Sequence, residues 1–196
     1  MNSANPAARS TVYVLVDGEN VDGTLSTILS RPPQSDDRPR WEMVHRFAER
    51  LWGGRTAKPM FFINVRPEAS VPWPFVQALQ ACHFRPVLLT GDEGRKVVDD
   101  GIQKTLDALE KRNGDVLLLS HDKDFCARLA ALGHNDERHI AVLAFKEYLA
   151  ADYGHIQGLD VFDLEVDARA FPNGPLPRMR PIPIEEFDPD MLLDSL

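Results

Sequence analysis

The sequence predicts an α/β fold in which helices cover a mostly parallel sheet of five strands. The first observation is that five short apolar runs, rich in β-branched and aromatic residues, recur along the chain. The second is that segments with apolar residues at helical spacing separate these runs, and strands that alternate with helices form parallel sheets. The chain has 196 residues, of which 43% are hydrophobic, and this suits one domain with an ordinary core.

The expected strands are short and end close to polar or charged residues. The run 11–16 is apolar and β-branched and stops at Asp17. The run 116–119 is almost wholly aliphatic and stops at Ser120. The five expected strands span residues 11–16, 60–65, 86–89, 116–119 and 139–145.

The expected helices follow apolar periodicity, and several stop at glycine. The segment 97–111 has the clearest apolar stripe, and Gly114 follows its end. Residues 17–23 are expected to form a loop because glycine and asparagine favour unusual backbone angles, with Thr24 as the cap of the next helix. The expected helices span residues 24–29, 41–51, 75–82, 97–111, 124–132 and 146–151.

The two ends of the chain do not follow this alternation. Residues 1–10 are small and polar, so we expect a flexible leader before a domain that covers residues 11–168. Prolines interrupt the pattern afterwards, and residues 169–196 are expected to form an extended acidic tail with Leu192 and Leu193 as anchors. Exposed sheet edges and tails often mediate homodimers, and a homodimer is compatible with this organisation.

Charge is distributed unevenly along an acidic chain. The formal net charge is −8, which argues mildly against binding to nucleic acid. Residues 31–66 hold eight Lys/Arg and four Asp/Glu, a balance of +4, whereas residues 159–196 hold nine acids and three arginines, a balance of −6. A basic face on an acidic chain can still contact phosphates, although for any one of these arginines simple solvation is the favoured explanation.

Several classes of protein are disfavoured by motifs that the sequence lacks. Cys82 and Cys126 lie in no Cys-x-x-Cys pair, and no His/Cys cluster has zinc spacing, so a reducing, cytoplasmic setting is expected. No apolar run approaches the roughly 20 residues that span a bilayer, so no membrane partner is expected. The sequence contains no Gly-x-Ser-x-Gly, Walker A or dinucleotide fingerprint, which disfavours hydrolase triads, NTPases and dehydrogenases.

Four aspartates lie at or just beyond the ends of strand-like runs: Asp17, Asp99, Asp122 and Asp124. The carboxyl ends of parallel strands share one edge of a sheet, and ligands bind in the crevice there. Carboxylates gathered in a crevice repel one another unless a cation lies between them, and hard divalent ions such as Mg²⁺ prefer oxygen ligands. The pattern therefore predicts a metal site.

The same aspartates also have structural interpretations. Asp122 or Asp124 alone is explained as a helix N-cap, although two acids on that turn exceed what capping needs. Asp99 and Asp100 both fall in the first turn of a helix, where acids complement the dipole. Asp99 is preferred as the ligand because its place on the helix leaves it near the crevice rim, and Asp100 stays an alternative.

Three further residues near these acids are open to more than one interpretation. Asn20 could hold Asp17, contact a phosphate or occupy a turn. Lys96 could approach a phosphate or pair with the neighbouring acids. His121 is interpreted as structural rather than catalytic, since none of the six histidines has ligand spacing.

Three blocks of the sequence, taken together, resemble the NYN domains, a branch of the PIN-like nucleases. The blocks are VLVDGEN at 14–20, KVVD at 96–99 and LLSHDKDF at 118–125. Their order and spacing carry the resemblance, which spans about residues 11–145. It implies a Rossmann-like three-layer α/β/α fold and a cluster of acids that binds Mg²⁺ or Mn²⁺ in proteins that cut or process RNA.

The resemblance assigns roles to residues of the three blocks. The acids that match the family's catalytic and metal-binding positions are Asp17, Asp99, Asp122 and Asp124. The residues expected to face the substrate are Asn20, Lys96 and Ser120. The sequence departs from the family where His121 replaces a small residue and where Thr105 or Leu106 replaces a further acid, for which Asp107 could compensate if the register slips.

Three functions are compatible with these residues. The first is a metal-dependent ribonuclease, in which bound ions activate a water and neutralise the phosphodiester during in-line displacement. Its expected partner is RNA, with Trp73 or Trp41 as a platform for base stacking. The second is a catalytically weak or inactive RNA-binding or adaptor module, which the missing helical acid favours. The third is another phosphotransfer enzyme, such as a phosphatase with Asp17 as nucleophile and Glu19 as the second acid.

Overall fold

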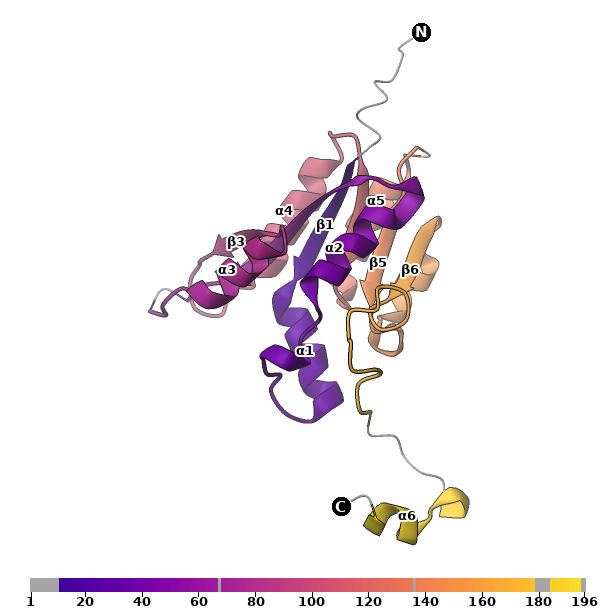
Figure 1. Ribbon diagram of the computed structural model, residues 1–196. Helices are drawn as coiled ribbons and strands as arrows, with labels where there is room; N and C mark the ends of the chain where they lie inside the picture. Colours follow the sequence, from indigo (N-terminus) through magenta and orange to yellow (C-terminus); the bar gives the residue numbers. More distant parts are fainter. Residues whose placement is uncertain (1–10, 67, 136, 179–183, 195–196) are drawn as a thin grey trace.

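The protein has a Rossmann-like fold of three layers, with a parallel sheet between two layers of helices (Figure 1). The computed structural model describes residues 11–66, 68–135, 137–178 and 184–194. The predicted α/β class is therefore confirmed, and the expected leader at residues 1–10 lies outside the described residues.

The sheet has six strands in the order β3-β2-β1-β4-β5-β6, and every neighbouring pair is parallel. The chain adds β2 and β3 on one side of β1 and then β4 and β5 on the other. The carboxyl ends of β1 and β4 therefore form the topological switch point, where ligands bind in open parallel sheets. The strands are β1 (Thr11–Asp17), β2 (Thr56–Asn64), β3 (Arg85–Leu89), β4 (Asp115–Leu119), β5 (Ile140–Ala144) and β6 (Leu159–Asp163).

The expectation of five strands is wrong by one, because β6 was missed. This strand pairs with β5 along its whole length and forms an edge of the sheet. Its sequence, LDVFD, contains two acids, and its only buried residue is Asp163. The two acids interrupt the apolar run by which the other strands were identified, including the opposite edge strand β3 with the sequence RPVLL.

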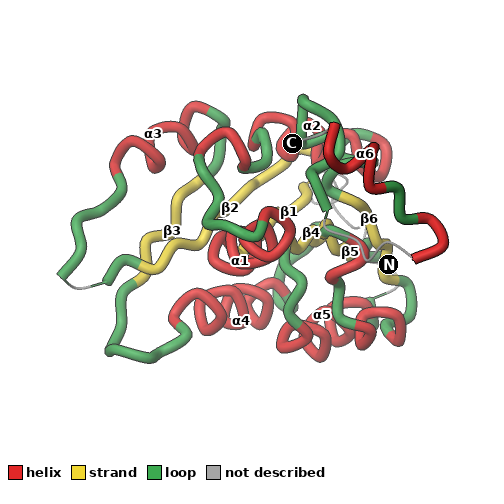
Figure 2. The backbone as a smooth tube through the Cα atoms, turned by 90° about the horizontal axis from the view of Figure 1, so that it is seen from below, coloured by secondary structure: helices red, strands yellow, loops and turns green. Residues whose placement is uncertain are grey.

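Helices cover both faces of the sheet, as Figure 2 shows from below. One face packs against α4 (Val97–Leu109) and α5 (Cys126–Gly133). The other face packs against α1 (Gly18–Leu29), α2 (Trp41–Arg50) and α3 (Trp73–Ala81). None of the helices in the described ranges combines the length and the apolar character needed to cross a bilayer.

The expected loop at residues 17–23 is instead the start of α1. The Asp17 carboxylate accepts a hydrogen bond from the backbone N–H of Asn20 at 3.1 Å, so Asp17 is the N-cap of this helix. Val21 and Leu25 are buried on its inner face. Glycine and asparagine in this segment therefore signal a capped helix that begins immediately after the strand, rather than a turn.

Past β6 the chain stays packed on the domain beyond the expected boundary at residue 168. Ala170 is buried, and its carbonyl accepts a hydrogen bond from the N–H of Arg40 at 2.8 Å. Further along, Arg178 forms an ion pair with Glu165. The folded unit thus includes the first residues of the segment that was expected to be tail.

The remaining tail is not extended throughout. It contains the 3-10 turn η7 (Ile184–Glu186) and the short helix α6 (Pro189–Asp194). The Asp188 carboxylate accepts two backbone hydrogen bonds in the first turn of α6, at 3.0 and 3.2 Å, and proline suits the first helical position. Leu193, an expected anchor, is exposed, and the side chain of Leu192 lies outside the described residues.

Candidate metal centre

Three aspartates from distant parts of the sequence meet at the carboxyl edge of the sheet. Each of Asp99, Asp122 and Asp124 offers a carboxylate oxygen, and these oxygens all lie within 4.8 Å of one another. Asp99 and Asp122 are half-buried, and Asp124 is exposed. Carboxylates at this separation repel one another, and a hard divalent cation between them would relieve the repulsion.

Local hydrogen bonds position the two aspartates that follow β4. Asp122 is the N-cap of the 3-10 turn η4 (Lys123–Phe125), because its Oδ1 accepts the backbone N–H of Asp124 at 3.0 Å. The buried Tyr153 hydroxyl donates to the backbone carbonyl of Asp122 at 2.6 Å. One hydrogen bond to the side chain of Asp122 and one to its backbone carbonyl therefore fix the position of this turn.

Asp99 reaches the centre from the other side of the crevice, in the first turn of α4. Val98 and Ile102 are fully buried and fix which face of the helix points inward. The helix N-terminus stabilises the negative charge of Asp99. The neighbouring Asp100 instead pairs with Arg95 at 2.9 Å, so the structure places Asp99 rather than Asp100 in the centre.

Lys96 contributes a cation to the same centre. Its ammonium group lies 3.2 Å from Asp99 Oδ2 and 3.7 Å from Asp124 Oδ2. Asp99 raises the pKa of Lys96 most strongly, and Asp122 and Asp124 add to the effect. The lysine side chain is exposed, so an incoming metal ion can displace the ammonium group at little cost in packing.

Asp17 lies beside these three residues but is not one of the group whose oxygens are mutually close. It is buried at the end of β1, where its Oδ1 accepts from the Asn20 N–H and its Oδ2 from the Ser120 hydroxyl, both at 3.1 Å. Burial raises the pKa of Asp17 to about 6, against the lowering effect of these two hydrogen bonds. The negative charges of Asp99 and Glu19 make smaller contributions to this rise, so the charge of Asp99 bears on the protonation of Asp17.

Ser120, which was expected to face the substrate, is fully buried. Its hydroxyl donates to Asp17 and accepts the backbone N–H of Asp122 at 3.3 Å. The hydroxyl thus links the end of β1 to the turn after β4. In this structure Ser120 positions the two acids and does not reach the surface.

The side chain of Asn20 likewise forms its hydrogen bonds within the protein. Its side-chain oxygen accepts hydrogen bonds from the backbone N–H of His121 at 2.8 Å and from the ring Nδ1 of the same residue at 2.7 Å. Of the three roles that the sequence left open, the structure supports the first, because the backbone N–H of Asn20 donates to Asp17. The side chain of Asn20 also ties α1 to the segment that carries Asp122. A phosphate contact through this oxygen would require breaking both bonds.

His121 is a buried, neutral support of the centre, as its structural interpretation predicted. The backbone N–H of Phe145 donates to Nε2 at 2.9 Å, so the ring proton must lie on Nδ1, which donates to Asn20. Burial lowers the pKa of His121 to about 4. The ring also stacks on Phe145 at a centroid distance of 5.7 Å.

Two residues of the network could not be assigned from the sequence. Tyr153 and Phe145 lie far along the chain from Asp122 and His121, and no motif links them. Asp107, which was considered as a substitute for a missing helical acid, pairs instead with Arg128 at 2.8 Å and is exposed. The departure from the family pattern at Thr105 and Leu106 is therefore not compensated by Asp107.

Comparison with known proteins supports the fold and leaves the function open. A solved structure of a protein of unknown function from Vibrio parahaemolyticus matches with a TM-score of 0.64 and 14% sequence identity, covering 84% of this chain and 98% of that chain. No family model matches the sequence. No curated protein matches it either.

Proposed function

We propose that the protein is a metal-dependent ribonuclease of the NYN type, which hydrolyses RNA phosphodiester bonds at the acidic centre. The observation that carries the proposal is the meeting of Asp99, Asp122 and Asp124 at the topological switch point of a parallel sheet. These hard oxygen donors suit Mg²⁺ or Mn²⁺. A bound ion of this kind neutralises phosphate charge and lowers the pKa of a water molecule.

The residues of the chain would hold the ion and leave the attack to water. Asp99, Asp122 and Asp124 would supply the oxygen ligands. Asp17, which is buried beside Asp99, would add negative charge to the site. The Ser120 hydroxyl is buried and hydrogen-bonded, so it is a poor nucleophile. Burial raises the pKa of the Cys126 thiol to about 11, which keeps it protonated at neutral pH. These properties favour hydrolysis without a covalent intermediate.

The cations that could contact RNA are fewer than the sequence suggests. In the basic stretch at residues 31–66, several arginines pair with carboxylates of the protein: Arg31 with Asp37, Arg38 with Asp22 and Arg55 with Asp115. Lys96 lies at the centre itself and is exposed. We therefore assign the phosphate contact nearest the scissile bond to Lys96, and expect binding to weaken as salt rises.

The test is cleavage of single-stranded and structured RNA in Mg²⁺ or Mn²⁺. Asp99→Asn and Asp122→Asn should each lower the rate about a hundredfold or more, because each removes an anionic ligand. Asp107→Asn is the matched control, since Asp107 lies on α4 but outside the centre, and its rate should stay within about twofold of wild type. Equal rates in wild type, Asp99→Asn and Asp122→Asn would remove the proposed site.

A second readout does not depend on activity. At about 100 times its dissociation constant, Mn²⁺ should stabilise the wild type by about 2.7 kcal/mol and raise its melting temperature. Asp122→Asn should lose most of this stabilisation, and Asp107→Asn should keep it. Thermal denaturation with and without EDTA measures the difference.

A catalytically weak or inactive RNA-binding module is the second candidate. The observation that favours it is Lys96, whose ammonium group already neutralises part of the acidic centre. The absence of an acid at Thr105 or Leu106 points the same way. RNA binding that persists in EDTA, without cleavage in either metal, would decide for this candidate.

The phosphatase alternative is less compatible with the geometry. Asp17 is buried and both of its oxygens accept hydrogen bonds, so it is poorly placed to attack a phosphate ester. A cytoplasmic location and a homodimer stay predictions from the sequence.

A further inference from the structure

A pocket of about 670 Å³ opens beside the acidic centre, on the other side of α1. Its size falls in the range of ordinary ligand sites. We call it the aromatic pocket, because Phe61, Phe62, Phe75 and Trp41 form much of its wall. The remaining lining comes from the first turn of α1, the segment between α1 and α2, the end of β2 and the start of α3.

The first turn of α1 is shared between the pocket and the centre. Gly18 and Glu19 line the pocket, and Asp17, the residue before them, caps the helix and is coupled to Asp99. A Cβ atom on Gly18 would lie only 2.4 Å from a ring carbon of Phe61, so glycine lets the helix start directly against the aromatic wall. Figure 2 shows α1 between the layer of α4 and the layer of α3.

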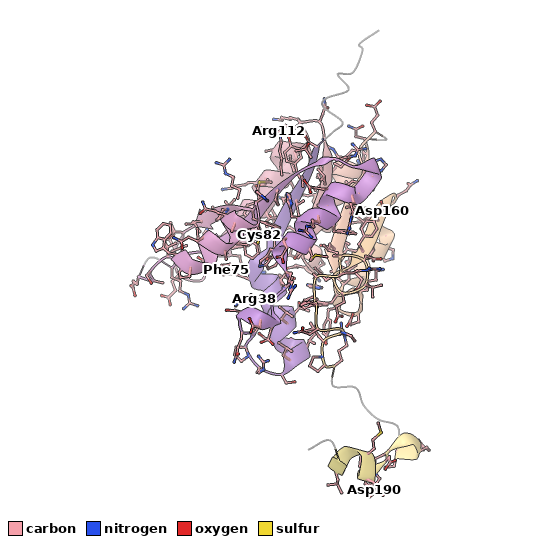
Figure 3. All side chains as sticks on the ribbon, in the orientation of Figure 1. Arg38, Phe75, Cys82, Arg112, Asp160 and Asp190 are labelled. Atoms are coloured by element: carbon pink, nitrogen blue, oxygen red, sulfur yellow. The ribbon has the colours of Figure 1, made fainter. Side chains whose placement is uncertain are left out.

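Two planar groups in this pocket are held in fixed orientations. The guanidinium of Arg38 lies over the ring of Phe75, 5.8 Å from its centroid, and both side chains are labelled close together in Figure 3. Asp22 holds Arg38 through both carboxylate oxygens, with Nε–Oδ1 at 2.9 Å and Nη2–Oδ2 at 2.6 Å. Phe75 meets Phe61 edge-on at 5.3 Å. Aromatic rings and guanidinium planes of this kind are the groups on which unpaired bases stack.

The pocket continues along the carboxyl edge of the sheet. Asn64 also lines a neighbouring hollow of about 890 Å³, between the loops that follow β2 and β3. Arg66 lies in that hollow together with three acids, Glu68, Asp92 and Glu93, so the hollow has no cationic surface for phosphates. Trp73 is 59% exposed and stands between Pro72 and Pro74 of the wall of the aromatic pocket, where it offers a neighbouring base a second surface for stacking.

We propose that the aromatic pocket binds one unpaired nucleobase of a single-stranded RNA whose backbone passes over the acidic centre. This inference rests on the proposed function and adds to it: the substrate is single-stranded, because a base must leave its helix to enter the pocket. The RNA would run from the centre to the aromatic pocket at the end of β2, with Phe75 and Arg38 as the stacking residues.

The test measures the binding of a short single-stranded RNA and of the four nucleoside monophosphates in EDTA, by calorimetry or ligand-observed NMR. Ala78 is exposed on α3 and lines the pocket, so Ala78→Trp fills the pocket without removing a core contact. Gln80→Trp adds the same side chain to an exposed position of α3 that does not line the pocket. Base stacking contributes about 1–3 kcal/mol, so Ala78→Trp should weaken RNA binding by about tenfold and Gln80→Trp by less than twofold.

A second variant covers the case in which Ala78→Trp fails to fold. Phe75→Leu keeps an apolar side chain but removes the aromatic plane, and it should also weaken RNA binding while melting near the wild-type temperature. Equal affinity for RNA in wild type, Ala78→Trp and Gln80→Trp overturns the pocket assignment. The pocket assignment is also overturned if double-stranded RNA binds as tightly as single-stranded RNA and Ala78→Trp lowers the affinity for neither of them.

The outcomes separate this inference from the proposed function. Cleavage that requires Asp122, combined with RNA binding that is insensitive to Ala78→Trp, removes the pocket and leaves the nuclease. Binding that depends on the pocket, without cleavage in any metal, removes the nuclease and leaves a single-strand-binding module. Binding of nucleoside monophosphates as tightly as of RNA would replace the polymer with a free nucleotide and overturn the single-strand assignment.

Discussion

Asp17 and Asp115 are buried aspartates on neighbouring parallel strands, at opposite ends of the sheet and in opposite surroundings. Asp115 begins β4, where Arg55 Nη1 lies 2.7 Å from its Oδ2 and the N–H of His139 donates to its Oδ1. Asp17 ends β1, where the nearby charges of Asp99 and Glu19 are both negative. One end of the sheet is neutralised by a buried ion pair, and the other is only partly neutralised, by the exposed Lys96.

The contrast is between a buried carboxylate that a fixed cation compensates and one that no fixed cation compensates. A buried carboxylate beside a fixed cation is a self-contained ion pair, whereas removal of the cation would leave an uncompensated buried charge. At the carboxyl edge, Asp99, Asp122 and Asp124 lie near the exposed Lys96, and burial raises the pKa of Asp17 to about 6. Clusters of carboxylates that include a buried group with a perturbed pKa are common at sites adapted to bind a ligand.

The largest expected effect is on the neutralised end of the sheet. Arg55→Met should lower the free energy of unfolding by about 3–5 kcal/mol at pH 7, because it leaves the buried carboxylate of Asp115 without its cation. Urea denaturation followed by circular dichroism measures the loss. The double variant Arg55→Met/Asp115→Asn should recover part of it, since the amide carries no charge.

Asp17→Asn tests the other end under the same conditions. In EDTA this variant should be as stable as the wild type or more stable, because it removes a buried charge that no cation compensates. A loss of unfolding free energy as large as that of Arg55→Met would show that the charge of Asp17 is compensated in the folded protein as fully as that of Asp115.

The next largest expected effect is a dependence of the free energy of unfolding on pH. The folded-state pKa of Asp17, about 6, lies above the ordinary value of 3.8, so the folded protein binds this proton more tightly than the unfolded chain. The contribution of Asp17 is therefore most favourable below pH 3.8 and falls as pH rises to about 6. The shift of about two pKa units corresponds to roughly 3 kcal/mol. Unfolding in EDTA between pH 4 and 7 measures it, with Asp17→Asn as the reference.

The difference in stability between wild type and Asp17→Asn should change across this interval and level off above about pH 6. Saturating Mn²⁺ should weaken the pH dependence, because a nearby cation favours the ionised carboxylate. A difference that is constant from pH 4 to 7 would contradict a raised pKa for Asp17.

The inner strands and the amphipathic helices could be predicted from the sequence, because burial gives them strong periodic patterns. β6 could not, since the two acids of its sequence LDVFD interrupt the apolar run that revealed even the opposite edge strand β3. The start of α1 was missed for a different reason. Gly18 and Asn20 favour turns when considered alone, and only the position of Asp17 at the end of β1 makes them the first turn of a capped helix.

The acids of the centre could also be predicted, because strand ends and helix starts place Asp99, Asp122 and Asp124 at one edge. The supporting residues could not. Ser120 was expected to face the substrate, yet it is buried between the acids, and its role depends on a hydrogen bond to Asp17 across more than 100 residues of chain. Contacts of this range depend on the fold and leave no local pattern in the sequence.

The smallest expected effect concerns Lys96, the cation that partly neutralises the acidic end. Lys96→Gln should raise the affinity of the centre for Mn²⁺ by about two- to fivefold, because the ammonium group of this exposed ion pair competes with the metal but is held only weakly. Lys104→Gln, also exposed on α4, should leave the affinity unchanged. If Lys96 also contacts the phosphate, Lys96→Gln will bind metal more tightly and RNA more weakly, a combination that neither role alone produces. Calorimetric titration with Mn²⁺ and RNA binding in Ca²⁺ test the two roles, and weaker metal binding in Lys96→Gln would contradict the competition.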